Sequence, residues 1–261
     1  KRFSIGRNKP PLHMHNKGQI TLVGAGPGDP ELITLKGVNA LQKADVIFYD
    51  ALISPLLLEH NRTAEKIFVG KRSGQHQTSQ EDINRWIVSY ALQDKNVVRL
   101  KGGDPLVFGR ACEELNSAKE NGIPTFIVPG ISSFSGIAAQ HQIPITKRQE
   151  HQSFWVVTGH TAAGKFSEDL YWAAQSSATV IVLMGVRHLA KIVALFQVTK
   201  TGDYPVAIVQ NGTTKAERSL VATLDTIEEE VTLHVIENPA VLFFGPAVTD
   251  AVTHFRKPVN A

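Results

Sequence analysis

The chain has 261 residues, of which 43% are hydrophobic and 20% are charged, and its formal net charge is +3 at pH 7. This length and composition predict one large or two small globular α/β domains, and so mild a charge argues against a nucleic-acid-binding face or a polybasic membrane surface. The single cysteine, Cys112, excludes an internal disulfide framework and a cysteine-based zinc site, so we expect a cytoplasmic protein. No apolar run approaches the roughly 20 residues of a membrane span, and residues 1–17 are expected to form a disordered tail without a signal peptide.

From Gln19 onward, short β-branched runs alternate with helix-like segments, the pattern of parallel βαβ units. The expected strands are 19–26, 45–50, 66–70, 97–105 and 125–130, and the expected helices are 34–44, 80–92 and 111–120. These elements predict a complete α/β domain over residues 18–131.

After this domain, the pattern weakens into a helix and a polar, proline-containing link, which we place at 132–152. A second α/β domain is expected over 153–250, with strands at 153–160, 178–185, 205–212, 218–224 and 239–245 and a helix near 188–196. No long helix precedes the run RSLVATL at 218–224, so this domain is predicted to mix antiparallel strands into its sheet.

Several expected strands end in glycine-rich turns, at 24–29, 102–105, 129–130, 184–185 and 211–212. Ligands of open α/β sheets bind beyond the carboxyl ends of the strands, where glycine lets a ligand approach the backbone. The clustering of such turns indicates a nucleotide-like ligand. Glycine also ends many strands for purely structural reasons, so a single turn carries little weight.

The turn at 24–29 has some features of a dinucleotide-binding turn, because Asp50 stands at the end of the next strand, where a ribose-binding acid would belong. Three details oppose this interpretation: Gly28 falls one position early for the glycine spacing, Pro27 lacks a backbone N–H, and Asp29 would repel a pyrophosphate. A phosphate-free cofactor is therefore favoured, and S-adenosylmethionine is one.

Longer motifs identify a family. In chain order they are VGAGPGDPELITLKG, YDALIS, VGKRSGQHQTSQEDIN, VVRLKGGDPLVFGR, VPGISSFSG, IPIT, VTGH, LMG and PVAIVQNGT. Their order resembles that of the uroporphyrinogen-III C-methyltransferases, in the tetrapyrrole methylase family, over about Gln19 to Val248. The resemblance implies a class III methyltransferase of two α/β domains, usually a homodimer, that binds S-adenosylmethionine and substrate in the cleft between the domains. It also implies transfer of two methyl groups to ring carbons of uroporphyrinogen III, which gives precorrin-2 for sirohaem or cobalamin synthesis.

The resemblance also implies the cofactor contacts, which fall on Pro27, Gly102, Gly103, Asp104, Val107, Ser132, Ser133, Met184 and Gly212. Gly102 and Gly103 would permit close approach, Asp104 could accept from ribose hydroxyls, and Met184 offers a soft apolar surface to adenine. Structural alternatives remain open, because Met184 could be strand core and the two serines could cap the following helix.

The proton acceptor and proton donor of the family match Asp50 and Lys71. Asp50 ends a strand and Lys71 follows one, so both are expected to project toward the cleft. Without the family, either residue would more often be a solvated surface charge. Methyl transfer to an electron-rich ring carbon needs mainly alignment, with proton removal assisting.

A polycarboxylate substrate requires cations in the cleft. The candidates are Arg72, Lys101, Arg110, Lys147 and Arg148, with His76 as a weaker one, and each could equally be a solvent-facing or ion-paired charge. We expect no metal, because no histidine or carboxylate cluster has ligand spacing.

The chain departs from the family pattern near these cations. Ala51 stands where arginine is common, Ala111 and Cys112 replace two glycines, Ser132-Ser133 replaces a threonine-alanine pair, and 147–149 replaces a histidine-arginine-aspartate run. These departures leave other substrates open. The alternatives are a methylase of a later precorrin, an RNA methylase and a non-catalytic ligand-binding module. Aromatic residues are only 7% of the chain, with little basic clustering, which opposes an RNA substrate.

Overall fold

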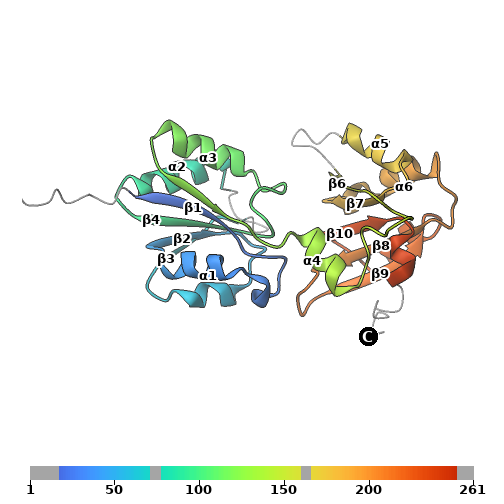
Figure 1. Ribbon diagram of the computed structural model, residues 1–261, viewed down its shortest axis with the longest axis horizontal. Coiled ribbons are helices and arrows are strands. Elements are labelled where there is room, and N and C mark those ends of the chain that lie inside the picture. Colours follow the sequence, from blue (N-terminus) through green and yellow to red (C-terminus); the bar gives the residue numbers. More distant parts are fainter. Residues whose placement is uncertain (1–17, 71–77, 160–165, 252–261) are drawn as a thin grey trace, which may run out of the picture.

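The computed structural model describes residues 18–70, 78–159 and 166–251, which form two α/β domains side by side (Figure 1). Each domain is built on one five-stranded sheet. No helix within these ranges is long and apolar enough to cross a membrane. The expected tail at 1–17 and the predicted site residues Lys71, Arg72 and His76 lie outside the described residues.

The first sheet is parallel throughout and has the strand order β3-β2-β4-β1-β5. Its strands are β1 (Gln19–Gly24), β2 (Val46–Tyr49), β3 (Glu65–Phe68), β4 (Asn96–Lys101) and β5 (Thr125–Val128). Helices cover both faces of a parallel sheet, so its inner strands are buried on both sides, as the continuous apolar runs of β1 and β2 require.

Helices lie on both faces of this sheet (Figure 1). One face packs against α1 (Leu35–Gln42) and the 3₁₀ helix η2 (Pro55–His60), and the other packs against α2 (Gln80–Ala91) and α3 (Ala111–Glu120). Helices α1 and α2 begin where side-chain caps satisfy free N–H groups: the hydroxyl of Thr34 accepts from Gly37, and that of Ser79 accepts from Asp82.

The second sheet has the order β6-β7-β10-β8-β9. Its strands are β6 (Phe154–Thr158), β7 (Thr179–Leu183), β8 (Pro205–Gln210), β9 (Arg218–Thr223) and β10 (Ala240–Phe244). Only the β6–β7 pair is parallel, and the other three pairs are antiparallel. The prediction that this sheet mixes antiparallel strands is therefore confirmed.

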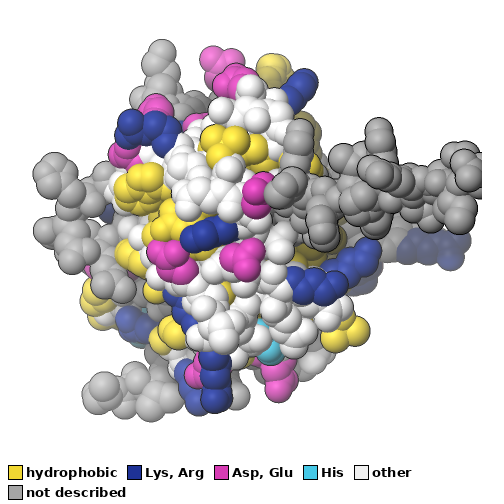
Figure 2. Space-filling model, turned by 90° about the vertical axis from the view of Figure 1, so that its left-hand side faces the viewer, with side chains coloured by type: hydrophobic (Ala, Val, Ile, Leu, Met, Phe, Trp, Pro, Cys, Tyr) yellow, Lys and Arg dark blue, Asp and Glu magenta, His cyan; other side chains and the backbone are white. Residues whose placement is uncertain are grey.

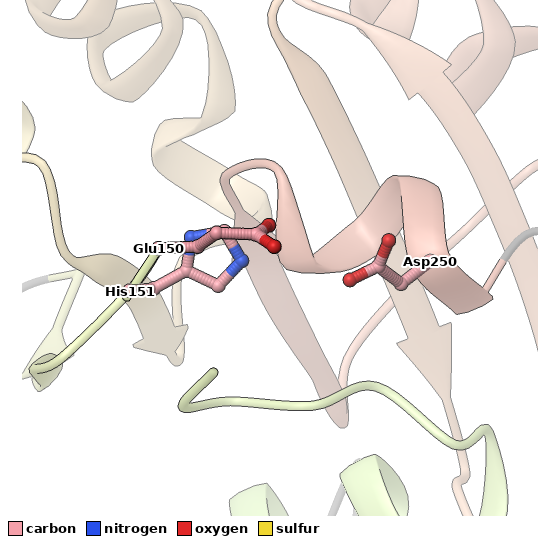
Figure 3. Close-up of side chains that lie close together, drawn as sticks. All are labelled: Glu150, His151 and Asp250. Atoms are coloured by element: carbon pink, nitrogen blue, oxygen red, sulfur yellow. The ribbon is translucent and has the colours of Figure 1, made fainter. Parts of the chain in front are cut away.

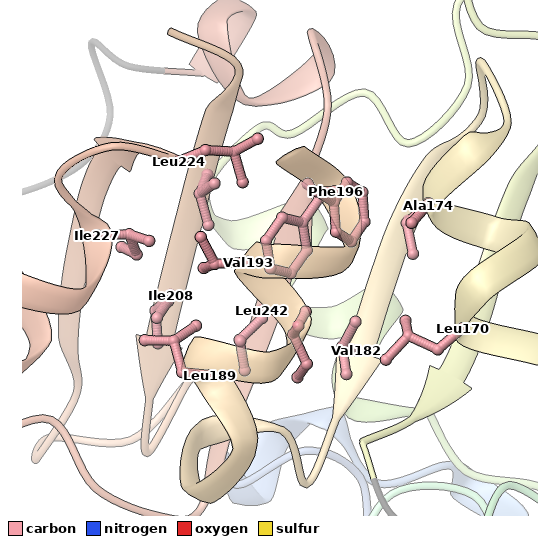
Figure 4. Packing of buried hydrophobic residues seen from close by; sticks show 14 of the residues in the cluster. Leu170, Ala174, Val182, Leu189, Val193, Phe196, Ile208, Leu224, Ile227 and Leu242 are labelled. Carbon is pink, nitrogen blue, oxygen red and sulfur yellow. The ribbon is translucent and has the colours of Figure 1, made fainter. Parts of the chain in front are cut away.

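One face of the second sheet packs against α5 (Glu168–Gln175), α6 (Leu189–Gln197) and α7 (Ile227–Leu233), with the 3₁₀ helix η3 (Val186–His188) leading into α6. This is an apolar core in which the rings of Phe196 and Phe244 stack with centroids 4.3 Å apart. Figure 4 shows aliphatic side chains of β7, β8 and β10 packed around Phe196.

The opposite face of the second sheet packs against α8 (Ala247–Ala251) and α4 (Ser133–Gln140). Helix α4 follows β5 of the first sheet along the chain, yet Ile137 and Ala138 are buried in the core of the second. Near its start, Gly136 packs so closely under Pro27 that a Cβ there would lie 2.7 Å from the proline Cγ. The connecting helix therefore joins the first glycine-rich turn to the second domain.

Candidate active site between the two domains

Three glycine-rich turns meet at the carboxyl edge of the first sheet. The backbone N–H of Gly103 donates to Gly26 O over 2.7 Å, which joins the turn after β4 to the turn after β1. A Cβ at Gly24 would collide with the backbone of Gly130, and one at Gly130 would collide with the Gly103 carbonyl. Glycine is required here because the three backbone segments approach without room for side chains.

The Asp104 side chain organises these turns. Its Oδ1 accepts from Leu106 N at 2.8 Å, and its Oδ2 accepts from Gly130 N at 3.1 Å. The predicted contact of this carboxylate with ribose hydroxyls stays a prediction. Each carboxylate oxygen can accept a further hydrogen bond, so the turn and a ligand could share this side chain.

A cavity of about 1230 Å³ adjoins the turns and is lined by both domains. The first domain contributes segments 27–31 and 51–56, and the second contributes 211–215 and 238–241. Four of the predicted cofactor residues line the cavity, namely Pro27, Ser133, Met184 and Gly212. The others, Gly102, Gly103, Asp104, Val107 and Ser132, lie in the adjoining turns and at the start of α4, where a Cβ on Gly103 would be 3.6 Å from Ser133 N.

The cavity wall is largely apolar. Met184 follows β7 with 41% of its surface exposed, which rules out the alternative that it is strand core. Leu52, Leu56 and Phe108 also line the cavity and are exposed. Large apolar side chains open to solvent mark ligand sites more often than free surface. Ser132 stands at the N-cap of α4 but makes no capping bond with its side chain, so the capping alternative is not observed for it.

Asp50 lies at the end of β2, next to the cavity-lining segment 51–56. Its side chain is 28% exposed, and its Oδ1 accepts a hydrogen bond of 2.7 Å from Arg99 Nη2. Asp50 is therefore not the solvated surface charge that its sequence alone would suggest. Its predicted partner Lys71 lies outside the described residues.

Arg99 belongs to a buried cluster of charges that the sequence did not predict. Arg99 and Lys101 are two residues apart on β4, so both side chains point to the same face of the sheet. This face is covered by α3, and both cations pair there with Glu114. Lys101 was predicted to offer a cation to the substrate, but it is 4% exposed and its ammonium lies 2.9 Å from Glu114 Oε2. Burial, together with the neighbouring Arg99, lowers the pKa of Lys101 despite the pairing with Glu114.

Two of the other predicted cations, Arg110 and Lys147, pair with nearby carboxylates. Arg110 is exposed and makes two hydrogen bonds of 2.7 Å to Glu113, and Arg148 is exposed. Lys147 lies in the link before β6, where its ammonium is 2.9 Å from Glu150 Oε2 and 3.1 Å from Asp250 Oδ2. Substrate binding by these residues stays a prediction.

Glu150, His151 and Asp250 lie together on the second domain (Figure 3). They form the one group of three candidate metal ligands within the described ranges, and His151 Nε2 is buried there without a hydrogen-bond partner. The Lys147 ammonium already lies beside both carboxylates and offsets one of their two negative charges. We therefore assign no metal to this group.

A second polar network supports the opposite wall of the cavity. Thr213 Oγ1 accepts from Asp29 N at 3.1 Å, so it connects the first glycine-rich turn to the second domain. Glu217 holds this threonine by accepting from its N–H at 2.7 Å, and its other oxygen lies 3.0 Å from His141 Nε2. Burial alone would raise the pKa of Glu217, but the hydrogen bonds from His141 and Thr213 outweigh it and lower the pKa. This pairing was not predicted, because its members are far apart along the chain.

The surface bears on the prediction that nucleic acid is not a partner. Figure 2 shows the end of the first domain that faces away from the second, and there the Lys and Arg side chains are interspersed with Asp and Glu. A broad basic face would be expected of an RNA-binding surface, whereas the described residues in this view carry charges of both signs, and the absence of a nucleic-acid partner stays a prediction.

The chain folds as two α/β domains that share a cavity at the carboxyl edge of a parallel sheet, which is the arrangement of the tetrapyrrole methylase fold. The family profile of the tetrapyrrole (corrin/porphyrin) methylases matches residues 19–228, so the chain belongs to this family.

Among its relatives, the uroporphyrinogen-III C-methyltransferase of Methanocaldococcus jannaschii is 44% identical over 88% of this chain and 97% of that protein. A siroheme synthase of Zymomonas mobilis is 46% identical over 88% of this chain, but the match spans only 49% of that longer protein. The crystal structure of uroporphyrin-III C-methyltransferase from Thermus thermophilus in complex with S-adenosyl homocysteine superposes with a TM-score of 0.77. It is 35% identical over 89% of this chain and all of that one.

Proposed function

We propose that this protein is a uroporphyrinogen-III C-methyltransferase that uses S-adenosylmethionine and gives precorrin-2. The observation that carries the proposal is the match over nearly the whole length of the Methanocaldococcus enzyme, at 44% identity. The Thermus structure with S-adenosyl homocysteine supports the same cofactor. Precorrin-2 can feed sirohaem or cobalamin synthesis, and the proposal holds for either route.

The cavity suits a cofactor of this chemistry. Its apolar wall at Met184 and Leu52 fits an adenine ring and a thioether, and the glycine-rich turns give access to backbone groups. Asp29 uses its Oδ1 to cap the next turn at Glu31 N, which places a negative charge where a dinucleotide would need its pyrophosphate. S-adenosylmethionine supplies an electrophilic methyl group and carries no phosphate.

We propose that the residues of this chain act mainly by orientation. The turns at 102–104 and the start of α4 would hold the cofactor, while the arginines and lysines near the cavity would bind substrate carboxylates. Asp50 would accept the proton released from the ring when the new carbon–carbon bond forms, and Lys71 would return a proton where the ring requires one. A positioned base contributes roughly 10²- to 10⁴-fold to such a rate.

One experiment separates this proposal from its rivals. The purified protein is incubated anaerobically with uroporphyrinogen III and methyl-labelled S-adenosylmethionine, and the products are analysed by absorbance and mass. We expect a product whose mass has increased by two methyl groups less two protons, with an absorption spectrum that differs from that of the substrate. Labelling only of a later precorrin or of RNA would redirect the substrate assignment, and cofactor binding without any labelled product would identify a non-catalytic module.

We also propose that the protein is a cytoplasmic homodimer. Strand β5 is an edge strand of the first sheet and β6 is an edge strand of the second. Both carry exposed aromatic and aliphatic side chains, such as Phe126 and Trp155, which support an association surface. Light scattering after size exclusion tests the dimer, and a monomer at micromolar concentration would exclude it.

A further inference from the structure

All three nitrogens of the Arg99 guanidinium are engaged in the interior of the first domain. Nε donates to Glu114 Oε1 at 2.9 Å, Nη1 donates to Leu100 O at 3.1 Å, and Nη2 donates to Asp50 Oδ1 at 2.7 Å. Three bonds in different directions fix both the position and the plane of a guanidinium. The Asp50 carboxylate is therefore bound to a group that cannot reorient without breaking other contacts.

Glu114 is the fixed end of this arrangement. Its side chain is 0% exposed, and besides Arg99 it accepts from Lys101 Nζ at 3.0 and 2.9 Å and from Gln80 Nε2 at 3.4 Å. Because Arg99, Lys101 and Gln80 all donate to it, the Glu114 carboxylate has a fixed position, and its bond to Arg99 fixes the guanidinium as well. Helix α3 is thus connected through Arg99 to the residue at the end of β2.

The four charges balance, and only one of them reaches solvent. Arg99, Lys101 and Glu114 have side chains that are 4%, 5% and 0% exposed, whereas that of Asp50 is 28% exposed. Buried ion pairs seldom add net stability compared with well-packed apolar side chains, and the neighbouring position Val97 on the same face of β4 is apolar. A role in holding Asp50, the exposed member of the network, would explain why these charges are buried.

The Asp50 contact leaves one oxygen for chemistry. Arg99 uses Oδ1, and Oδ2 has no hydrogen bond with any residue in the described ranges. A proton leaving the substrate ring would form its new O–H bond at Oδ2, while its bonding electrons stay in the ring and Arg99 keeps all its own protons.

We propose that Arg99 is a positioning residue, held by Glu114, that orients Asp50 for proton removal during methyl transfer. This inference rests on the proposed function and deepens it. The Arg99 side chain is 4% exposed, and of its three partners only Asp50 reaches solvent, so we expect its effect on the rate to pass through Asp50. That requirement distinguishes it from a residue that merely stabilises the fold.

A double-mutant cycle tests the requirement. Single-turnover methyl transfer to uroporphyrinogen III is measured for wild type, Arg99→Lys, Asp50→Asn and the double variant. We expect Arg99→Lys to lower the rate by about 10- to 100-fold in the wild-type background and by less than about twofold in the Asp50→Asn background, because coupled residues are not additive. Affinity for S-adenosyl homocysteine should change by no more than a few-fold in any variant.

Two further variants keep the cycle decisive. Glu114→Gln preserves shape, removes the charge that holds Arg99, and should behave as Arg99→Lys does in both backgrounds. Arg85→Lys alters an exposed ion pair with Asp82 on the neighbouring helix α2 and should leave the rate unchanged.

The outcomes that would overturn the proposal are separate. Equal rate losses in both backgrounds, or no loss in the wild-type background, would show that Arg99 does not act through Asp50. Failure of both Arg99→Lys and Glu114→Gln to fold would make the network structural. A wild-type protein without methyl transfer would overturn the proposed function and this inference together, whereas an active wild type with additive variants would overturn the inference alone.

Discussion

The two domains differ in the side chains that are buried against their sheets. In the first domain the face of β4 toward α3 carries Arg99 and Lys101, and Glu114 closes over them. In the second domain the described part of the core contains no buried Arg, Lys, Asp or Glu, and its centre is the stacked pair of Phe196 and Phe244. Apolar burial contributes stability directly, whereas buried ion pairs contribute little or nothing. The first domain therefore carries buried charges next to the cavity, whereas the second lines the cavity from a domain with an apolar core.

The largest expected effect tests the chemical side of this comparison. Asp50→Asn preserves the shape of the side chain and its bond to Arg99 but removes the negative charge. We expect the single-turnover methyl-transfer rate to fall by roughly 10²- to 10⁴-fold, with the affinity for S-adenosyl homocysteine changed only a few-fold. An unchanged rate would return Asp50 to a structural role, and a collapse of affinity would reassign it to cofactor binding.

The next effect tests the apolar side. Phe244→Ala removes one ring of the stack and opens a cavity in the second core, so the free energy of unfolding should fall by about 3–5 kcal/mol. Urea denaturation followed by circular dichroism measures the change. Leu233→Ala, on the exposed side of α7, is the control and should change stability by no more than about 0.5 kcal/mol. A loss below 1 kcal/mol for Phe244→Ala would mean that the second domain does not depend on this core.

A matched pair of glycine variants separates strain from cofactor contact. Gly103 has φ +67°, so Gly103→Leu should cost about 1–2 kcal/mol of stability and reduce S-adenosyl homocysteine affinity by more than about 10-fold. Gly122 has φ +65° and open space around its Cβ position, so Gly122→Leu should cost the same stability and leave affinity unchanged. Titration calorimetry in the presence of a chelator measures both variants, and wild-type binding should not need metal. Equal affinities would make the turn after β4 purely structural.

The smallest effect concerns the network that joins the domains. Glu217→Gln should destabilise the protein by about 1 kcal/mol at neutral pH, because the bond to His141 and the charge-assisted bond from Thr213 weaken. The pKa of Glu217 is lowered in the folded protein, so the stabilisation is complete above the usual pKa of 4.5 and is lost as the pH falls through the folded value. The difference between wild type and variant should therefore shrink below about pH 4.5. A constant difference would contradict the assignment.

Much of the fold followed from local patterns. Each observed strand coincides with a predicted β-branched run, because such runs favour strands and sheet burial needs them. Helices α5 and α7 were not predicted. In α5 the buried residues Leu170, Ala173 and Ala174 form a short i, i+3, i+4 stripe in which two of the three side chains are small, and in α7 only Ile227 is buried, so the apolar signal of both segments is weak.

The candidate site was predictable only where it depends on the ends of strands. Glycine-rich turns after parallel strands must meet at one sheet edge, and those after β1 and β4 do. The pairing of Arg99 with Glu114 depends on how α3 is rotated over β4, which spacing along the chain does not determine. Two cations at alternate positions of the otherwise apolar β4 could have predicted a buried acidic partner, because cations inside a parallel sheet require one.

The position of α4 has a practical consequence for anyone who divides this chain. In sequence order the link at 132–152 separates the two domains, but a fragment starting at 153 would expose the part of the second sheet's core that Ile137 and Ala138 cover. A fragment that starts at 132 keeps these two residues on the second sheet. However, the same cut removes Gly136, which packs against Pro27, from the first domain. Neither domain can be separated without losing packing contacts of α4, so the two domains form one structural unit.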